Sequence, residues 1–380
     1  MRQASRDRLP LQARKTNEAR DDGSCETKTP PENTAMQYID GNLCIFLPMR
    51  ALQFTSPRPI ESNPLALAER PIPEPGDNDI LVRIRACGIC HTDLHVIEGE
   101  LPQKKSPLTP GHQIVGIVER AGKNVSNHRI GDRVGVPWLY STCGECEYCR
   151  SEKENLCEGA KFTGYDVDGG FAEYVLVPAE FAYSLPANFS DEMAAPLLCA
   201  GVIGFRALRL CNIKPGERLG LYGFGASAHI VVQVARHWGC DVYAFSRSEH
   251  HRKLALELGA VWTGTAEMIP PHLLHSAISF APVGELVPKA LAVLRKGGTL
   301  ALAGIYVSDI PSFEYSLLYH ERTVRSVANS TCQDVIDFLK IAAEIPVRTE
   351  IEVFLLEEAN RALQLLKASK ISGAGVLTME

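Results

Sequence analysis

The strongest constraint on the fold is an alternation of strand-like and helix-like segments over residues 218–305. Apolar stretches that end in glycine or polar residues are each followed by a stretch with helical periodicity. This alternation is typical of a doubly wound parallel sheet, because parallel strands need a crossover helix between them. The expected strands are 218–225, 240–246, 275–281 and 298–305, and the expected helices are 226–239, 248–260 and 284–298.

The first of these strands runs into the glycine-rich turn YGFGASAH. Gly223, Gly225 and Ala228 form G-x-G-x-x-A between a strand and a helix, the context in which this short motif indicates a dinucleotide-binding loop. Gly223 permits the tight turn, Gly225 lets the backbone approach a pyrophosphate at the helix N-terminus, and Ala228 allows close packing. A glycine-rich turn in another kind of α/β protein is the alternative.

The end of the next strand bears on which dinucleotide binds. Ser246 stands where an acidic residue usually binds the ribose 2′-hydroxyl, and Arg247 follows it. Without the carboxylate a 2′-phosphate is not repelled, and an arginine offers it a charge-assisted partner. The pattern favours NADP(H) over NAD(H), unless Arg247 is merely solvated or stacks on the adenine.

The segments before this region have a different texture. Alternating apolar and polar residues, punctuated by glycine and proline, predict a β-rich compact domain. Its expected strands are 79–88, 112–122, 132–139 and 169–178; a helix is expected over 191–210, and mixed short elements over about 350–380.

Composition narrows the class of protein. The net charge of −6 argues against nucleic acid or an anionic membrane as a partner, and no apolar run looks long enough to span a bilayer. Residues 1–48 are polar, and their seven Lys/Arg are balanced by seven Asp/Glu. They resemble neither a transit peptide nor a secretory signal. We expect a disordered extension, or an upstream start-site artefact ahead of Met49, and a cytoplasmic protein.

Four of the 12 cysteines lie close together in CGECEYCRSEKENLC. Cys143, Cys146, Cys149 and Cys157 have the spacing C-x2-C-x2-C-x7-C, and four thiolates at such a spacing can bind one Zn²⁺ tetrahedrally. A closed four-thiolate site has no open position, so this zinc would hold a loop rather than do chemistry. Unconnected surface cysteines are the alternative, and a zinc-ribbon DNA-binding loop is disfavoured because the segment is not basic.

A second cysteine motif, CGICHTDLH at residues 87–95, has several possible meanings. Its C-x-x-C-H could be a haem attachment site, but covalent haem attachment occurs in exported proteins. A thioredoxin-like dithiol is also disfavoured, because the motif does not open a helix in a βαβ unit.

Taken together, CGICHTDLH, PGHQIVGIVERAG, CGECEYC, GGFAEY, LLCAG and GFGASAH resemble the zinc-dependent alcohol dehydrogenases of the medium-chain dehydrogenase/reductase family. The resemblance covers about residues 49–380. It implies an α/β protein with a GroES-like β-rich catalytic domain over 49–200, completed by 333–380, and a Rossmann doubly wound parallel-sheet domain over 201–332. The active site would lie in the cleft between them.

The resemblance also assigns roles to individual residues. Cys90, His112 and Cys199 would hold a catalytic zinc with one open position, a set that no local spacing reveals. Asp93 would hydrogen-bond His112, and His91 would contact the cofactor pyrophosphate. The resemblance gives Thr92 the role of a relay hydroxyl that passes the substrate proton, through the cofactor ribose, to His95. An ordinary surface histidine is the alternative for His95. Two Zn²⁺ per chain and NAD(P), leaning to NADP, are the expected cofactors.

Two positions depart from the family pattern, and a third bears on substrate. Gln113 stands where a glutamate commonly follows the ligand histidine, and Ile203 stands where relatives often have threonine. Trp138 is similar to a pocket residue of relatives that act on small primary alcohols, although it could be a core aromatic. We expect a small-to-medium primary alcohol or aldehyde as substrate, and a homo-oligomer (dimer or tetramer). Alternatives are a polyol or aromatic-alcohol dehydrogenase, or a non-enzymatic NADP(H)-binding protein.

Overall fold

The computed structural model describes residues 35–39, 42–46, 48–345 and 347–379. The chain divides into two compact units, Met1–Phe46 and Leu47–Glu380. In the first, β1 (Ala35–Ile39) and β2 (Asn42–Phe46) pair antiparallel. The disorder expected over residues 1–48 falls mainly outside the described residues. Within that stretch the structure describes only the β1–β2 hairpin and the first residue of β3 (Pro48–Gln53).

A six-stranded parallel sheet carries the glycine-rich turn. Its strands are β12 (Arg218–Tyr222), β13 (Asp241–Phe245), β14 (Trp262–Gly264), β15 (Leu274–Ser279), β16 (Leu294–Leu302) and β17 (Thr323–Ser326). Their order is β14-β13-β12-β15-β16-β17, and all neighbours are parallel. The order reverses between β12 and β15, the switch point at which such sheets bind ligands. The predicted doubly wound fold is confirmed.

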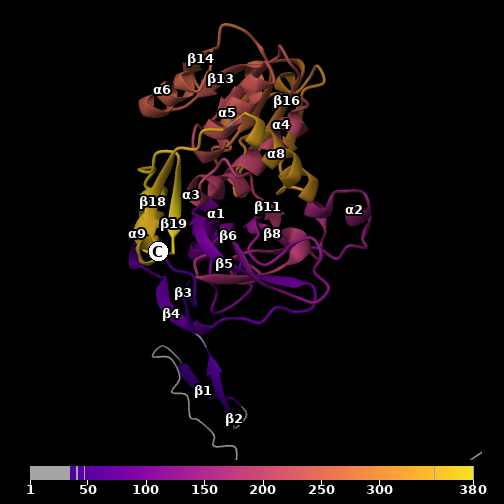
Figure 1. The fold of residues 1–380 in the computed structure, drawn as a ribbon. Helices are drawn as coiled ribbons and strands as arrows, with labels where there is room; N and C mark the ends of the chain where they lie inside the picture. The colour runs from indigo at the N-terminus through magenta and orange to yellow at the C-terminus, as the bar shows by residue number, and fades with distance from the viewer. Residues whose placement is uncertain (1–34, 40–41, 47, 346, 380) are drawn as a thin grey trace, which may run out of the picture. The chain divides into compact units, whose positions relative to one another are not determined.

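The helices that precede, connect and follow these strands lie beside the sheet (Figure 1). They are α4 (Ala200–Cys211), α5 (Ala226–His237), α6 (Glu249–Glu257), α7 (Leu286–Ala292) and α8 (Cys332–Glu344). The helix predicted over 284–298 is too long. It ends at Ala292, because Leu294 already pairs with Leu274 of β15, and Gly297 has a positive φ of 72°. Strand pairing overrides the helical periodicity there.

A seven-stranded, mostly antiparallel sheet forms the core of the GroES-like part. Its strands are β5 (Asp79–Gly88), β6 (Gln113–Ala121), β7 (Arg133–Val136), β10 (Tyr174–Pro178), β11 (Tyr183–Ser184), β18 (Ile351–Leu355) and β19 (Ala374–Thr378). The order is β11-β7-β6-β5-β19-β18, with β10 also paired to β5. Figure 1 shows the yellow C-terminal strands beside the indigo β5, to which β19 is hydrogen-bonded.

The strand predicted over 169–178 begins only at Tyr174. Before it, the N–H groups of Gly169, Gly170 and Phe171 donate to the carbonyls of Thr109, Gly111 and Pro110, at 2.7–2.9 Å. This loop therefore braces the segment that leads into His112.

The remaining elements are short. They comprise β4 (Ala66–Pro71), which pairs with β3; β8 (Leu139–Ser141), which pairs with β9 (Lys161–Phe162); α1 (His91–Glu98), α2 (Glu147–Arg150), α3 (Asp191–Ala194) and α9 (Ala359–Lys367); and the 3₁₀ turns η1 (Ile60–Ser62), η2 (Glu154–Leu156), η3 (Ala179–Phe181), η4 (Ala195–Leu198), η5 (Tyr315–Leu317) and η6 (Leu356–Glu358).

The helix predicted over 191–210 is interrupted. α3 and η4 are separated from α4 at Cys199, whose φ of −131° and ψ of −69° are not helical. An 18-residue window of Asp191–Cys211 has a mean hydropathy of 1.5, so by length and composition alone it could cross a membrane, which contradicts the expectation that no such run exists. Because 72% of it is buried inside the protein, the stretch has the character of a core helix.

Candidate active site and thiol clusters

Cys90 sits at the junction between β5 and α1. It is the N-cap of α1: its Sγ accepts the Thr92 N–H at 3.5 Å, and its own N–H donates to Asp93 Oδ2 at 2.8 Å. This reciprocal cap satisfies backbone donors at the start of the helix. It also fixes where the Cys90 thiol points.

His112 is held by the same aspartate. Its Nδ1 donates to Asp93 Oδ1 at 2.9 Å, and Gly111 N–H donates to that oxygen at 3.2 Å. Both side chains are almost fully buried. With the proton on Nδ1, Nε2 carries a lone pair, and it is buried without a hydrogen-bond partner. A buried acceptor with no partner is costly, so this atom is suited to a metal ligand.

The helix break brings a third donor to this place. Cys199 Sγ lies 4.0 Å from Cys90 Sγ, and the donor atoms of Cys90, His112 and Cys199 all lie within 4.8 Å of one another. Two sulfurs bound tetrahedrally to zinc at about 2.3 Å would be about 3.8 Å apart. The donor set therefore fits Zn²⁺ and leaves one position open. Cys87 lies outside this group and is fully buried.

Electrostatics also favour a cation here. Burial opposes protonation of His112, but Asp93 and then Cys90 raise its pKa to about 10. The pKa of Cys90 is lowered, mainly by the hydrogen bond from the Cys199 thiol and then by His112, although burial opposes the shift. A positive charge at this place therefore stabilises the Cys90 thiolate, and a Zn²⁺ bound to His112 Nε2 would supply it in place of a proton on that atom.

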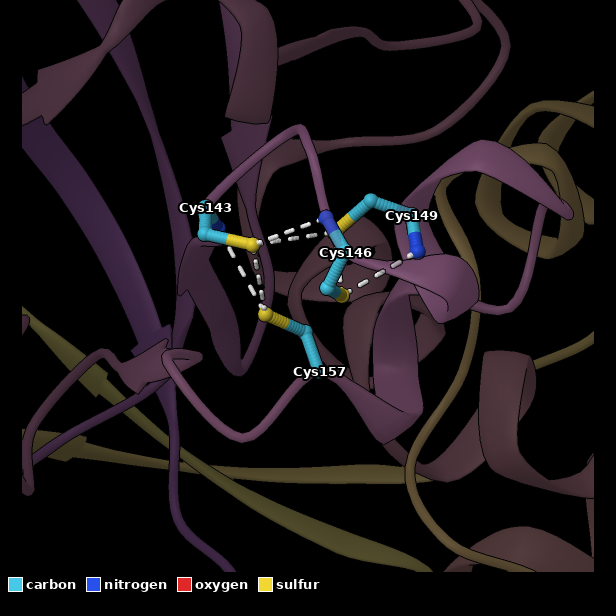
Figure 2. Close-up of side chains that lie close together, drawn as sticks. All are labelled: Cys143, Cys146, Cys149 and Cys157. Carbon is cyan, nitrogen blue, oxygen red and sulfur yellow. Dashed lines mark hydrogen bonds between the residues drawn. The ribbon is translucent and has the colours of Figure 1, made fainter.

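The four-cysteine loop converges just as closely (Figure 2). Cys143 Sγ lies 3.5 Å from Cys157 Sγ and 3.9 Å from Cys149 Sγ, and Cys146 Sγ lies 3.5 Å from Cys149 Sγ. Backbone N–H groups of Glu145 and Cys146 lower the pKa of Cys143 to about 6. All four sulfurs lie within 4.8 Å of one another, so this set fits a closed tetrahedral Zn²⁺ site.

The expected proton-relay residues lie along α1. Thr92 is buried, and its Oγ1 lies 3.6 Å from Cys90 Sγ, beside the expected metal. His95, one turn later, contacts the Glu100 carboxylate through Nδ1 and the Tyr306 ring at 5.8 Å between centroids. His91 is the first residue of the helix and is exposed. Glu100 and Tyr306 could not be predicted from the sequence, because neither belongs to a recognisable motif.

An aromatic stack borders the three-donor set. Trp138 meets the His112 ring edge to face at 4.9 Å between centroids. Phe162 and Tyr165 stack on the indole at 5.2 and 5.9 Å. The indole is therefore a packed aromatic that also contacts the expected metal ligand His112, and its role as a pocket residue stays a prediction. Phe162 and Tyr165 were missed from sequence, since only the tertiary fold brings them to Trp138.

The dinucleotide loop has the expected local geometry. Gly223 has φ +84°, and a side chain there would meet Ala281 after β15. A Cβ on Gly225 would meet nothing within 4 Å, so open space remains at the start of α5. Ala228 is fully buried in that helix. The loop thus offers the close backbone approach that a pyrophosphate needs.

The ribose end of the expected dinucleotide site carries two arginines. Ser246 is buried at the end of β13, and Arg247 is exposed. Arg252 of α6 donates to the carbonyls of Ser246 and Arg247 at 2.8 and 3.0 Å. Arg252 was missed from sequence; its place one turn into α6 after the Ser248 cap was the available signal.

The two departures from the family pattern lie near the donors. Gln113 is buried opposite Gly88 in the β5–β6 register, where a side chain on Gly88 would touch it. Ile203 is partly buried one turn after Cys199, whose carbonyl accepts its N–H at 2.8 Å.

Comparison with known proteins agrees with this geometry. The alcohol dehydrogenase GroES-like domain family matches residues 76–187, and the zinc-binding dehydrogenase family matches residues 228–344. The chain is 46% identical to "Probable alcohol dehydrogenase AdhA" of Mycobacterium tuberculosis, over 87% of this chain and 97% of that protein. It is 39% identical to an alcohol dehydrogenase of Geobacillus stearothermophilus, over 82% of this chain and 94% of that one.

Among solved structures, a CAD from Helicobacter pylori complexed with NADP(H) superposes with a TM-score of 0.80 at 26% identity, over 87% of this chain and 98% of that one. The fold, the three-donor set and the relatives matched over nearly their full length all indicate the same family. The chain belongs to the zinc-dependent alcohol dehydrogenases of the medium-chain dehydrogenase/reductase family.

Proposed function

We propose that this alcohol dehydrogenase prefers NADP(H) and interconverts small-to-medium primary alcohols and their aldehydes. The observation that carries the proposal is the convergence of Cys90, His112 and Cys199 beside the buried Trp138 indole. Three protein donors leave one position for a substrate oxygen, and the indole restricts the space next to it.

The roles of the chain's residues follow from their contacts. Zinc, when bound, lowers the pKa of a coordinated hydroxyl, and the dinucleotide exchanges hydride with the substrate carbon. Asp93 holds the His112 proton on Nδ1, so that Nε2 remains a ligand. Thr92 Oγ1, buried beside Cys90 Sγ, takes up the substrate proton, and His95 receives it nearer the surface. His91, exposed at the start of α1, would contact the pyrophosphate.

The four-cysteine site has a positioning role in this proposal. Asn155, between Cys149 and Cys157, donates to the Ala328 carbonyl at 2.6 Å. Glu154 accepts the Cys332 N–H at the start of α8, also at 2.6 Å. Zinc bound by the loop would hold these contacts with the segment that precedes α8.

Two comparisons of rates test the substrate and the cofactor. We expect kcat/KM for reduction of a small aliphatic aldehyde to be at least about tenfold higher with NADPH than with NADH, because one charge-assisted contact contributes about 1.4 kcal/mol or more. Arg247→Ala should reduce the preference for NADPH, and Ser246→Asp should reverse it. Arg236 pairs with Asp241 away from the loop, so the control variant Arg236→Ala should leave the preference unchanged. A preference for NADH in the unmodified protein would refute the assignment.

An aromatic-alcohol substrate is the second candidate, because a cinnamyl alcohol dehydrogenase of Sorghum bicolor superposes with a TM-score of 0.80. The stacked Trp138 favours smaller substrates. We expect Trp138→Leu to raise kcat/KM for cinnamaldehyde relative to propanal. A higher kcat/KM for cinnamaldehyde than for propanal in the unmodified protein would favour an aromatic-alcohol substrate. Turnover of any alcohol would dismiss a non-enzymatic role.

Three further assignments belong to the proposal. The division into 49–200 with 333–380 and 201–332 is supported by the membership of β18 and β19 in the β5 sheet. A cytoplasmic location suits thiols that are unpaired among the described side chains.

A homo-oligomer is supported by the edge position of β17 and by the exposed Tyr315 and Tyr319. Light scattering at several protein concentrations would test it.

A further inference from the structure

We propose that Glu100 is a positioning residue for proton transfer, and that its carboxylate holds the His95 ring so that Nε2 accepts the proton released during alcohol oxidation. The inference rests on the proposed role of His95 as the receiving group. Neither the family match nor any motif points to Glu100; the contact with His95 does.

The local backbone explains how this contact forms. α1 ends at Glu98, and Gly99 has a positive φ of 84°, which turns the chain back at the helix C-terminus. The Leu101 N–H then donates to the His95 carbonyl at 3.1 Å. Glu100 is thereby placed over the last turn of α1, where its Oε2 meets His95 Nδ1.

The hydrogen bond determines which nitrogen of His95 is free. An ionised carboxylate can only accept, so Nδ1 must donate to Glu100. In the neutral ring the proton is then on Nδ1, and Nε2 carries the lone pair. When Nε2 takes a proton, the ring becomes an imidazolium whose charge is balanced by the adjacent carboxylate.

The different exposure of His95 and Glu100 indicates the direction in which the proton would move. The Tyr306 ring, from the segment after β16, lies beside the His95 ring, with the centroids 5.8 Å apart and the planes tilted by 47°. The His95 side chain is 13% exposed, whereas that of Glu100 is 42% exposed. The proton thus arrives at a shielded ring and leaves for water beside an exposed carboxylate, with no other reactant needed.

Variants of the two residues test the proposal through turnover. We expect Glu100→Ala to lower kcat for alcohol oxidation about tenfold, with KM for the alcohol unchanged, as for loss of an orienting partner of a histidine. Glu100→Asp should restore much of the rate. In a His95→Gln background, Glu100→Ala should cause no further loss, because it acts through His95. An equal loss in both backgrounds would overturn the proposal.

Nitrogen-15 NMR of the histidine ring provides a readout independent of turnover. We expect the neutral His95 ring to carry its proton on Nδ1 in the unmodified protein and to mix tautomers in Glu100→Ala. Glu98→Gln is the matched control at the same helix end, because Glu98 binds Lys367 and the Ile60 N–H instead. An unchanged tautomer in Glu100→Ala would overturn the proposal.

Different results would refute the dehydrogenase function and the role of the His95–Glu100 pair. Absence of turnover with every alcohol and aldehyde in the unmodified, zinc-loaded protein would refute the proposed function and this proposal together. Normal alcohol oxidation by His95→Gln would leave the dehydrogenase intact and refute only the role of the His95–Glu100 pair.

Discussion

The two thiol clusters of this protein are built from similar donors by opposite routes. Cys143, Cys146, Cys149 and Cys157 lie within one loop, so a local turn and the short helix α2 are enough to bring them together. The second set draws Cys90 from the β5–α1 junction, His112 from the start of β6 and Cys199 from the break before α4. The first site can form with its loop, whereas the second needs the whole GroES-like sheet.

The clusters also differ in what they leave open. Four thiols fill a tetrahedron, and Cys143 lies exposed at the surface. The other set has three donors, and its His112 is buried with an unpartnered Nε2. The comparison teaches that donor number and burial, rather than thiol chemistry, separate a metal that holds a loop from one that can receive a substrate.

The largest effect should come from removing a donor of the three-donor set. Cys199→Ser should reduce kcat/KM by at least about 10³-fold, because the catalytic zinc is lost or misplaced. Zinc content should fall from two to one per chain, and the thermal midpoint should change little. Cys211→Ala, at the other end of α4, is the control and should keep both zincs and most activity. Full activity in Cys199→Ser would break the comparison.

The converse variant acts on stability. Cys146→Ser should destabilise the protein by about 3 kcal/mol or more, because structural zinc binding contributes directly to folding. Chemical denaturation and zinc analysis measure the loss. Enzyme that remains folded should keep kcat within about threefold, since no thiol of this loop belongs to the three-donor set. A loss of kcat without a loss of stability would show that the loop takes part in chemistry.

Low pH should destabilise the whole protein through the buried His229, and this limits the pH range in which the two clusters can be compared. Burial is the largest cause that lowers the pKa of His229 to about 4; its Nε2 accepts the Glu350 N–H at 3.3 Å. Between pH 6.5 and 4 the unfolded chain binds the extra proton, so this contribution is complete above about 6.5 and is lost as the pH falls. The expected loss is about 3 kcal/mol. Urea unfolding at several pH values measures it, and His229→Gln should flatten the dependence. An equal slope in that variant would assign the acid sensitivity to zinc loss.

A smaller effect should separate the metal from its support. Asp93→Asn keeps the shape of the α1 cap but weakens the hold on His112 Nδ1. We expect the three-donor set to lose about 10- to 100-fold in zinc affinity, while the four-cysteine set is unchanged. Competition with a chromophoric chelator resolves the two zincs. Equal weakening of both sites would point to a general loss of structure instead.

Prediction from sequence succeeded where the signal is local. The C-x2-C-x2-C-x7-C spacing and the strand–glycine–helix order around Gly223 depend only on neighbouring residues, and the structure has the expected convergence and turn. It failed where strand pairing or packing decides. Leu294 joins β15 rather than extending α7, and the apolar run 191–211 is interrupted at Cys199. His95 was predicted as a relay residue, but its partner Glu100 was not, since the helix end had to turn back first.

The sequence by itself determined the fold class, the glycine-rich turn before α5 and the four-cysteine cluster, because each depends on residue types at short, regular separations. Only the tertiary structure decided how Cys199 reaches Cys90 and His112, how Trp138 meets the His112 ring, and how Glu100 and Tyr306 enclose His95. Those contacts join segments whose separation along the chain carries no signal. They form because two buried sheets and a broken core helix fix positions that local preference leaves free.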